Sequence, residues 1–136
     1  MGKALGIDYG TKRVGIAISD SSQIIASGLC TVDNKKIFSF LKELILKEDV
    51  KIIVVGESKN LDNTETDSSK QIYHFVEKLK DQFPQVLIKT IDERFTSKIA
   101  LQSIIDSGFR KKKRQNKLLI DEVSATIILQ DYLSYK

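Results

Sequence analysis

Two short apolar runs flank a polar turn near the start of the chain and predict a β-hairpin. The runs cover residues 4–7 and 14–18, and the turn between them contains Gly10. A Gly-containing polar turn between two short apolar runs is typical of a hairpin loop. This arrangement places Asp8 at the end of the first predicted strand.

The position of Asp8 has two interpretations. A carboxylate close to a buried strand is costly unless a partner compensates its charge, and a divalent metal ion is one such partner. Alternatively, Asp8 only accepts hydrogen bonds from its own turn, as Asp residues often do. The spacing of the residues supports both interpretations equally.

The pattern after the hairpin predicts a third strand and then an amphipathic helix. The strand runs from Gln23 to about Val32 and follows a polar turn over residues 19–22, so the three strands form an antiparallel meander. Asp33 and Asn34 then offer an N-cap for a helix over residues 35–47, in which apolar positions recur at helical spacing.

Strands and helices alternate in the rest of the chain. Residues 51–56 are nearly all apolar and β-branched, as expected for a strand covered on both faces of a parallel sheet. A helix is predicted from Glu65 or Thr66 to Phe83, and it ends before Pro84. The remaining predicted elements are a loop over residues 57–67, a fifth strand over 86–91, a helix from Thr96 to about Asp106 closed by Gly108, and a last helix over 118–135.

This order of elements predicts an α/β fold with a mixed five-stranded sheet and helices on both faces. Right-handed crossovers give the strand order 3-2-1-4-5, with the first strand in the centre. Ligand sites in open α/β sheets form beyond the carboxyl ends of the parallel strands. Asp8, Gly56, Asp92 and Glu93 all fall at those ends. At 136 residues, the chain is most simply one domain over residues 1–136.

Composition narrows the class of protein. A hydrophobic content of 41% with 29% charged residues is ordinary for a globular protein, and no apolar run approaches the roughly 20 residues of a membrane span. The first residues lack a signal-peptide pattern, and Cys30 is the only cysteine, so no internal disulfide is possible. We therefore expect a cytoplasmic protein without membrane contact. The sequence leaves open whether it is a monomer or a homodimer.

The positive charge is concentrated in one short segment. Six of the eight positions from 110 to 117 are basic, and the net charge of +4 minus these six leaves −2 for the rest of the chain. Lys and Arg contacts to phosphate supply affinity for nucleic acids without sequence information, whereas a solvated charged loop is the alternative. The basic residues are Arg110, Lys111, Lys112, Lys113, Arg114 and Lys117.

Carboxylates from three separate elements are predicted to gather at one edge of the sheet. Asp8 follows the first strand, Asp92 and Glu93 follow the fifth, and Asp121 lies where the last helix begins. Converging acids repel one another unless cations neutralise them, and two carboxylate-held Mg²⁺ ions are the usual device for attack at a phosphodiester. Each acid also has a structural explanation of its own, such as a helix-dipole interaction for Asp121.

Several motifs together resemble the YqgF/RuvX family. These are bacterial Holliday-junction-resolvase-like proteins with an RNase H-like fold that are assigned to trimming the 5′ end of pre-16S ribosomal RNA. The resemblance spans nearly the whole chain, and the motifs occur in family order. They are Gly6-Ile7-Asp8-Tyr9-Gly10-Thr11-Lys12-Arg13-Val14-Gly15-Ile16-Ala17, Asp92-Glu93-Arg94-Phe95-Thr96-Ser97, Ile120-Asp121-Glu122-Val123-Ser124-Ala125 and Ile128-Leu129-Gln130-Asp131-Tyr132-Leu133.

The resemblance implies a functional role for each motif. Asp8, Glu93 and Asp121 would be the catalytic acids that bind Mg²⁺ or Mn²⁺, and Asp92 would be structural. Arg13, Arg94 and Thr96 would support the site or contact phosphate. We further expect Lys12 and the basic run from Arg110 to Lys117 to contact nucleic acid, and Gly10, Thr11 and Gly56 to support the site.

The chain departs from the family pattern after Gly56. Members of the family usually have Leu-Pro there, whereas this chain has Glu57-Ser58, and they often have Gly where Asn63 stands. Glu57 adds another acid near the predicted site. We interpret it as a solvated loop charge in preference to a metal ligand.

Three functional hypotheses follow from the sequence. The first is a Mg²⁺- or Mn²⁺-dependent nuclease for structured RNA or branched DNA, with ribosomal or transcription proteins as candidate partners. The second is a non-catalytic nucleic-acid-binding module that acts with the ribosome or the transcription machinery. The third is an ATP-binding fold of the actin and sugar-kinase type, which also contains Asp-x-Gly-Thr but needs two domains, more than this chain supplies.

Overall fold

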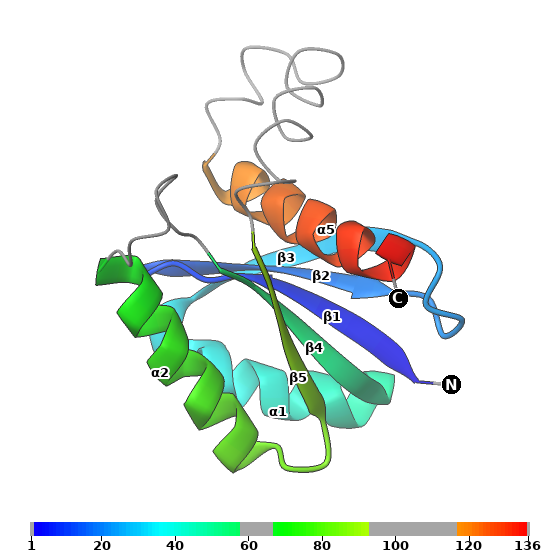
Figure 1. Cartoon of the computed structure of the whole chain (residues 1–136), viewed down its shortest axis with the longest axis horizontal. Coiled ribbons are helices and arrows are strands. Elements are labelled where there is room, and N and C mark those ends of the chain that lie inside the picture. Colours follow the sequence, from blue (N-terminus) through cyan, green and yellow to red (C-terminus); the bar gives the residue numbers. More distant parts are fainter. Residues whose placement is uncertain (1, 58–66, 93–116, 136) are drawn as a thin grey trace.

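A mixed five-stranded sheet forms the centre of the molecule (Figure 1). The computed structural model describes residues 2–57, 67–92 and 117–135. The order β3-β2-β1-β4-β5 confirms the predicted topology, with antiparallel β1–β2 and β2–β3 pairs and parallel β1–β4 and β4–β5 pairs. The strands are β1 (Lys3–Asp8), β2 (Arg13–Ser19), β3 (Ala26–Asp33), β4 (Val50–Glu57) and β5 (Leu87–Asp92).

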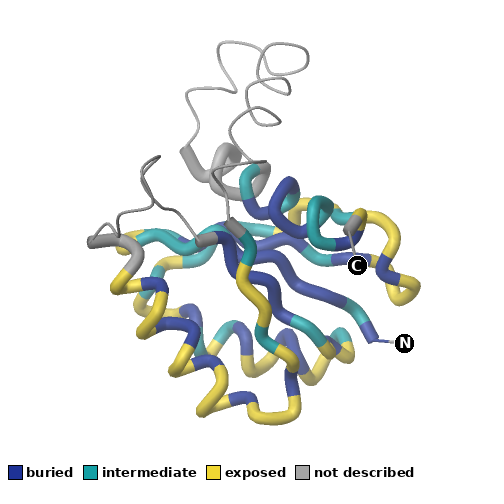
Figure 2. Tube along the Cα trace, in the orientation of Figure 1, coloured by how far each residue is buried: buried dark blue, intermediate teal, exposed yellow. Residues whose placement is uncertain are grey.

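Helices cover both faces of this sheet, as predicted. The helices α1 and α2 lie on one face, and α5 crosses the other (Figure 1). The central strands β1 and β4 are largely buried between these layers, whereas α1 and α2 each keep one side exposed (Figure 2). The helices are η1 (Asn34–Lys36, a 3₁₀ turn), α1 (Ile37–Glu48), α2 (Asp67–Gln82) and α5 (Lys117–Tyr135).

Residues of β1 alternate between two hydrophobic clusters, one on each side of the sheet. Leu5 and Ile7 are fully buried in the larger cluster, which α1 and α2 cover. Ala4 belongs to the smaller cluster on the opposite side, together with residues of α5 such as Ala125 and Leu129. This two-residue period is the ordinary consequence of strand geometry. It assigns every residue of β1 to one helical layer or the other.

The helix α5 packs directly against the backbone of β1 at Gly6. A Cβ atom added to Gly6 would lie 2.6 Å from the Cβ of Leu129 and 2.7 Å from the carbonyl oxygen of Ala125. Neither atom is the end of a flexible side chain, so a larger residue would displace the helix. Glycine at this position therefore allows the closest approach between helix and sheet.

A second contact fixes the C-terminal half of α5. The Gln130 side chain accepts a hydrogen bond from the Ala26 N–H at 3.0 Å and donates one to the Ile24 carbonyl at 3.1 Å. The two bonds join the helix to the main chain at the first residue of β3 and in the connection that precedes it. The helix is thus held along the strand direction as well as against the sheet.

The third strand begins at Ala26, so the prediction that it begins at Gln23 was wrong. The Asp20 carboxylate accepts hydrogen bonds from the N–H groups of Ile24 and Ile25 at 2.8 and 2.9 Å, and these bonds hold the pKa of Asp20 below its ordinary value. Gln23 adopts a positive φ of 57° and donates its side-chain amide to the Gly2 carbonyl at 2.7 Å. Turn hydrogen bonds thus replace strand pairing in this segment.

The other predicted boundaries agree within a few residues. The helix expected over residues 35–47 starts with the 3₁₀ turn η1, for which the Asp33 side chain accepts a hydrogen bond from the Lys35 N–H at 3.0 Å. The predicted helix from Thr96 to Asp106 lies outside the described residues, as does most of the predicted loop over residues 57–67. None of the helices in the described ranges combines the length and apolar character that a membrane crossing requires.

We expect Gly6→Ala to lower the free energy of unfolding by about 1–3 kcal/mol, because the added methyl group overpacks the contact between β1 and α5. Urea unfolding followed by circular dichroism measures this change. Ser27→Ala, at an exposed position of β3, is the control and should change stability by less than about 0.5 kcal/mol. Equal stabilities of the two variants would show that α5 moves away from β1 without cost.

Candidate functional site

Asp8 ends the central strand β1 and lies on the α5 side of the sheet. It follows Ala4 and Gly6 in the two-residue alternation, and Gly6 is the residue that meets α5. The Asp8 residue is half-buried and pairs with Gly15 of β2. The predicted position of this carboxylate at the carboxyl end of a central strand is therefore confirmed.

Asp121 lies in α5 one helical turn before Ala125, and Ala125 and Leu129 contact Gly6. One turn along α5 covers about 6 Å, and the two residues from Gly6 to Asp8 cover about 7 Å. The helix runs opposite to β1 (Figure 1), so both steps lead to the same end of the sheet. The backbone thus brings positions 8 and 121 to one end of the contact between β1 and α5.

The carboxyl ends of the two remaining parallel strands lie beside Asp8. Ile7 pairs with Val55, so the buried residue Gly56 continues β4 next to Asp8. In turn, β4 and β5 end in register, with Gly56 opposite Ile91 and Glu57 opposite Asp92. The sheet therefore brings together Asp8, Gly56 and the end of β5, as the sequence predicts.

Two hydrogen bonds from Asn34 hold the turn that follows Asp8. The Asn34 side-chain amide donates to the Gly10 carbonyl at 2.6 Å, and its backbone N–H donates to the Lys12 carbonyl at 2.9 Å. A Cβ atom on Gly10 would collide with the Arg13 carbonyl oxygen, so this turn also requires a glycine. Thr11 and Lys12 are exposed at its tip.

An aromatic contact supports the same turn from the α2 side. The ring of Tyr9 lies 4.6 Å from the ring of Phe75, and Phe75 lies 5.5 Å from Phe38 of α1, measured between ring centroids. The Lys78 ammonium covers the outer face of Phe38 at 4.7 Å from its centroid. Tyr9 is therefore half-buried and packs against the larger hydrophobic cluster. Its ring is a structural contact in this arrangement.

Sequence reasoning assigned Asn34 only to a helix N-cap and missed its contact with the turn. The signal was present in the predicted meander, since antiparallel pairing places the end of β3 beside the start of β2. In the observed register Arg13 lies opposite Asp33, so Asn34, the next residue, lies beside the turn that follows Asp8. The contact between Tyr9 and Phe75 has no comparable signal, because α2 is remote in sequence and its rotation follows from packing.

Several predicted site residues lie outside the described part of the chain. They are Glu93, Arg94, Thr96 and the basic residues Arg110, Lys111, Lys112, Lys113 and Arg114. For Glu57, Asp92, Lys117 and Asp121, the structure describes the backbone position. Their roles remain predictions.

The donor chemistry of this edge suits a hard divalent cation. Asp8 supplies a carboxylate, and oxygen ligands of this kind are preferred by Mg²⁺ and Mn²⁺. Within residues 2–57, 67–92 and 117–135, no three His, Cys, Asp or Glu side chains gather into a metal-binding group. Further ligands would therefore come from the side chains of other predicted site residues.

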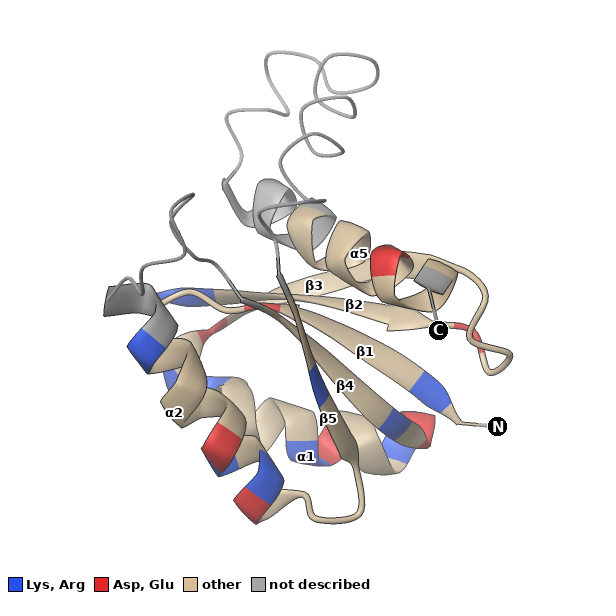
Figure 3. Ribbon diagram, viewed as in Figure 1, with Lys and Arg blue, Asp and Glu red and all other residues tan. Residues whose placement is uncertain are grey.

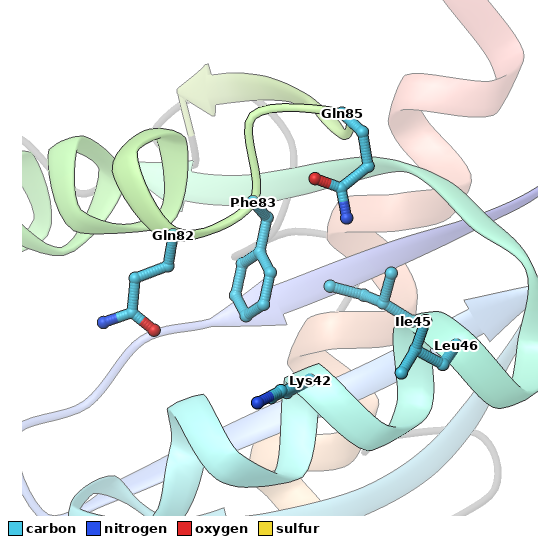
Figure 4. Close-up of a pocket in the computed structure, with 6 residues that line it drawn as sticks. All are labelled: Lys42, Ile45, Leu46, Gln82, Phe83 and Gln85. Atoms are coloured by element: carbon cyan, nitrogen blue, oxygen red, sulfur yellow. The ribbon is translucent and has the colours of Figure 1, made fainter.

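A separate cavity of about 300 Å³ lies between α1 and the end of α2 (Figure 4). It is close to the amino ends of β4 and β5, whereas Asp8 lies at the carboxyl ends of the parallel strands. The cavity therefore does not belong to the candidate site. Its lining residues are Lys42, Ile45, Leu46, Gln82, Phe83 and Gln85.

Similarity to known proteins extends over the whole chain. A family model described as RuvX, Holliday junction resolvase, matches residues 2–135. Relatives provisionally named as pre-16S rRNA nucleases from Flavobacterium psychrophilum and Flavobacterium johnsoniae are 52% and 50% identical to the chain, with 100% of the chain and 99% of each relative covered. A similarly named relative from Bacteroides thetaiotaomicron is 46% identical over 136 residues.

A solved structure of T. thermophilus RuvC in complex with a Holliday junction substrate resembles the chain in fold. The TM-score is 0.60 at 15% sequence identity, with 98% of this chain and 94% of that chain covered. A second RuvC structure from Thermus thermophilus gives a TM-score of 0.55. The RNase H-like fold predicted from the sequence is thereby confirmed.

We expect Asn34→Ala to loosen the turn after Asp8, because the Gly10 carbonyl loses its side-chain donor. The free energy of unfolding should fall by about 1 kcal/mol, and amide hydrogen exchange in residues 9–12 should accelerate relative to α5. Ser39→Ala is the control, since it removes a side-chain hydrogen bond from Ser39 of the neighbouring helix α1 to the Lys36 carbonyl. Unchanged exchange in the turn of Asn34→Ala would show that other contacts hold it.

Proposed function

The chain belongs to the RuvX family of Holliday junction resolvases, and on that basis we propose that it is a metal-dependent nuclease for structured nucleic acid. The observation that supports this proposal is the placement of backbone positions 8 and 121 at the same end of the contact between β1 and α5. The names of the relatives support pre-16S ribosomal RNA as a substrate. We further propose that the protein processes the 5′ end of this RNA in the cytoplasm, during ribosome biogenesis.

Asp8, Glu93 and Asp121 are the proposed ligands of two Mg²⁺ or Mn²⁺ ions. Glu93 is preferred to Asp92 because the resemblance to the YqgF/RuvX family implies Glu93 as the catalytic acid of the motif that begins at Asp92. When bound, a pair of such ions supplies an activated water and stabilises the charge that develops on the leaving oxygen.

The protein's own residues orient the substrate in this proposal. Asp8 is fixed by the central strand, and the turn after it is fixed by Asn34, so the carboxylate needs little reorganisation before it binds cations. Lys12 and Arg13 follow in the same turn and would contact phosphate groups near the scissile bond. The basic run before Asp121 would hold the nucleic acid from the α5 side.

We expect Asp8→Asn to reduce cleavage by more than about 100-fold while binding of the nucleic acid stays within a few-fold, because the amide is a poor ligand for a hard cation. The assay uses end-labelled RNA spanning the 5′ end of pre-16S ribosomal RNA and a four-way DNA junction. Each substrate is incubated with Mg²⁺, Mn²⁺ or EDTA.

Asp20→Asn is the matched control for this variant. It makes the same chemical change in the connection between β2 and β3, at the opposite end of the sheet, and should cleave as the wild type does. Normal cleavage by Asp8→Asn would show that the Asp8 carboxylate is not needed for cleavage and would contradict the proposed metal site. If the wild type binds both substrates and cuts neither, the chain is a nucleic-acid-binding module.

A further inference from the structure

The segment η1 lies directly beside the turn that carries Lys12. The Asn34 hydrogen bonds to Gly10 and Lys12 join these two segments, which are 24 and 22 residues apart in sequence. The pairing of Arg13 with Asp33 extends this contact into the sheet. Residues 9–13 and 33–36 therefore form one continuous surface at the carboxyl end of the sheet.

This surface carries one acid and four cations, which are Lys12, Arg13, Lys35 and Lys36. Lys12, Lys35 and Lys36 are exposed, and none of the three is in an ion pair with another residue in the described ranges. The acid is Asp33, whose carboxylate already accepts a hydrogen bond from the Lys35 N–H. Figure 3 shows the blue of Lys and Arg where the turn between β1 and β2 meets the start of the first helices. We call Lys35 and Lys36 the η1 patch.

The η1 patch lies within reach of a polymer bound at Asp8. The strand β3 is the second neighbour of β1, and neighbouring strands are about 4.8 Å apart, so their carboxyl-end positions are separated by about 10 Å. Lys12 and Arg13 occupy the space between. A nucleic-acid strand leaving Asp8 toward β3 would thus meet cations at the turn and then at η1.

We propose that the η1 patch binds backbone phosphates of the nucleic-acid substrate on the β3 side of the site. This inference rests on the proposed function, because it assumes that the polymer bound at Asp8 is a nucleic acid. A repeating anionic polymer is the partner that such spaced cations fit, since each ammonium contributes as a point charge.

The test measures binding without divalent metal, so that it is independent of cleavage. Fluorescence anisotropy gives the Kd of the wild type for the pre-16S RNA segment and the four-way junction in EDTA, between about 50 and 200 mM KCl. The test variant is Lys35→Gln/Lys36→Gln. The control is Lys42→Gln/Lys47→Gln, which removes the same charge from exposed positions farther along α1, toward its C-terminal end.

We expect the test variant to bind about 10-fold more weakly, and the slope of log K against log salt to fall by about 1 to 2. The control should bind within about 2-fold of the wild type, and both double variants should keep the wild-type melting temperature, because all four side chains are exposed. An unchanged salt slope in the test variant overturns the inference. Equal weakening in both variants also overturns it, because the effect would then be one of total charge.

The same proteins in the cleavage assay separate this inference from the proposed function. If the test variant binds weakly while the wild type cuts no substrate with any metal, the η1 patch stands and the nuclease proposal fails. If the wild type cuts and the test variant keeps its affinity, the nuclease proposal stands and the η1 patch fails. A wild type that does not bind either nucleic acid overturns both.

Discussion

The distance between α5 and the central strand is the constraint on which the rest of the site depends. At Gly6 there is no room for a Cβ atom, because Leu129 and the Ala125 carbonyl occupy that space. The neighbouring cluster contains Ala4, Ala17 and Ala125, so small side chains help the helix to lie close to the sheet at these positions. Dense packing of this kind transmits displacements, because the interior cannot absorb an added atom. A shift of α5 would therefore move Asp121 relative to Asp8.

The two layers of helices contribute differently to the site. On the α1 and α2 side, large apolar residues form the greater part of the core, which supplies most of the hydrophobic stabilisation. On the α5 side, small residues and the hydrogen bonds of Gln130 bury less apolar surface, and they contribute mainly by fixing the position of α5 on the sheet. Stability and site geometry are thus provided mainly by opposite faces of the same sheet. The turn after Asp8 contacts Asn34 of η1 and Phe75 of α2, so its position depends on the α1 and α2 side of the sheet.

Much of the fold was predictable because its signals are local. Apolar runs, caps and the single proline set the elements, and chain connectivity with right-handed crossovers set the strand order. The boundary at Gln23 was missed because its polar neighbours looked like an ordinary turn, whereas Asp20 extends that turn by binding two N–H groups. The contact between Tyr9 and Phe75 was not predictable for a different reason. It depends on the rotation of α2 about its axis relative to the sheet. The sequence pattern shows which face of α2 is apolar but does not define this rotation.

The candidate site was predicted at the level of strand ends and helix starts. Asp8 could be placed there because strand periodicity and topology suffice for a residue in the central strand. The choice between Asp92 and Glu93 could not be made from spacing, since adjacent residues differ only in the face they occupy.

The Gln130 contact affects which substitutions this protein can tolerate. Its two partners are the main-chain groups of Ile24 and Ala26, so the bonds do not depend on which side chains stand at those positions. Mutations at residues 24 and 26 can accumulate while α5 stays in register, provided that residue 26 does not become a proline, which would remove the N–H donor. Position 130 has no such latitude. Among related sequences, residues 24 and 26 should therefore vary, whereas Gln130 should be retained.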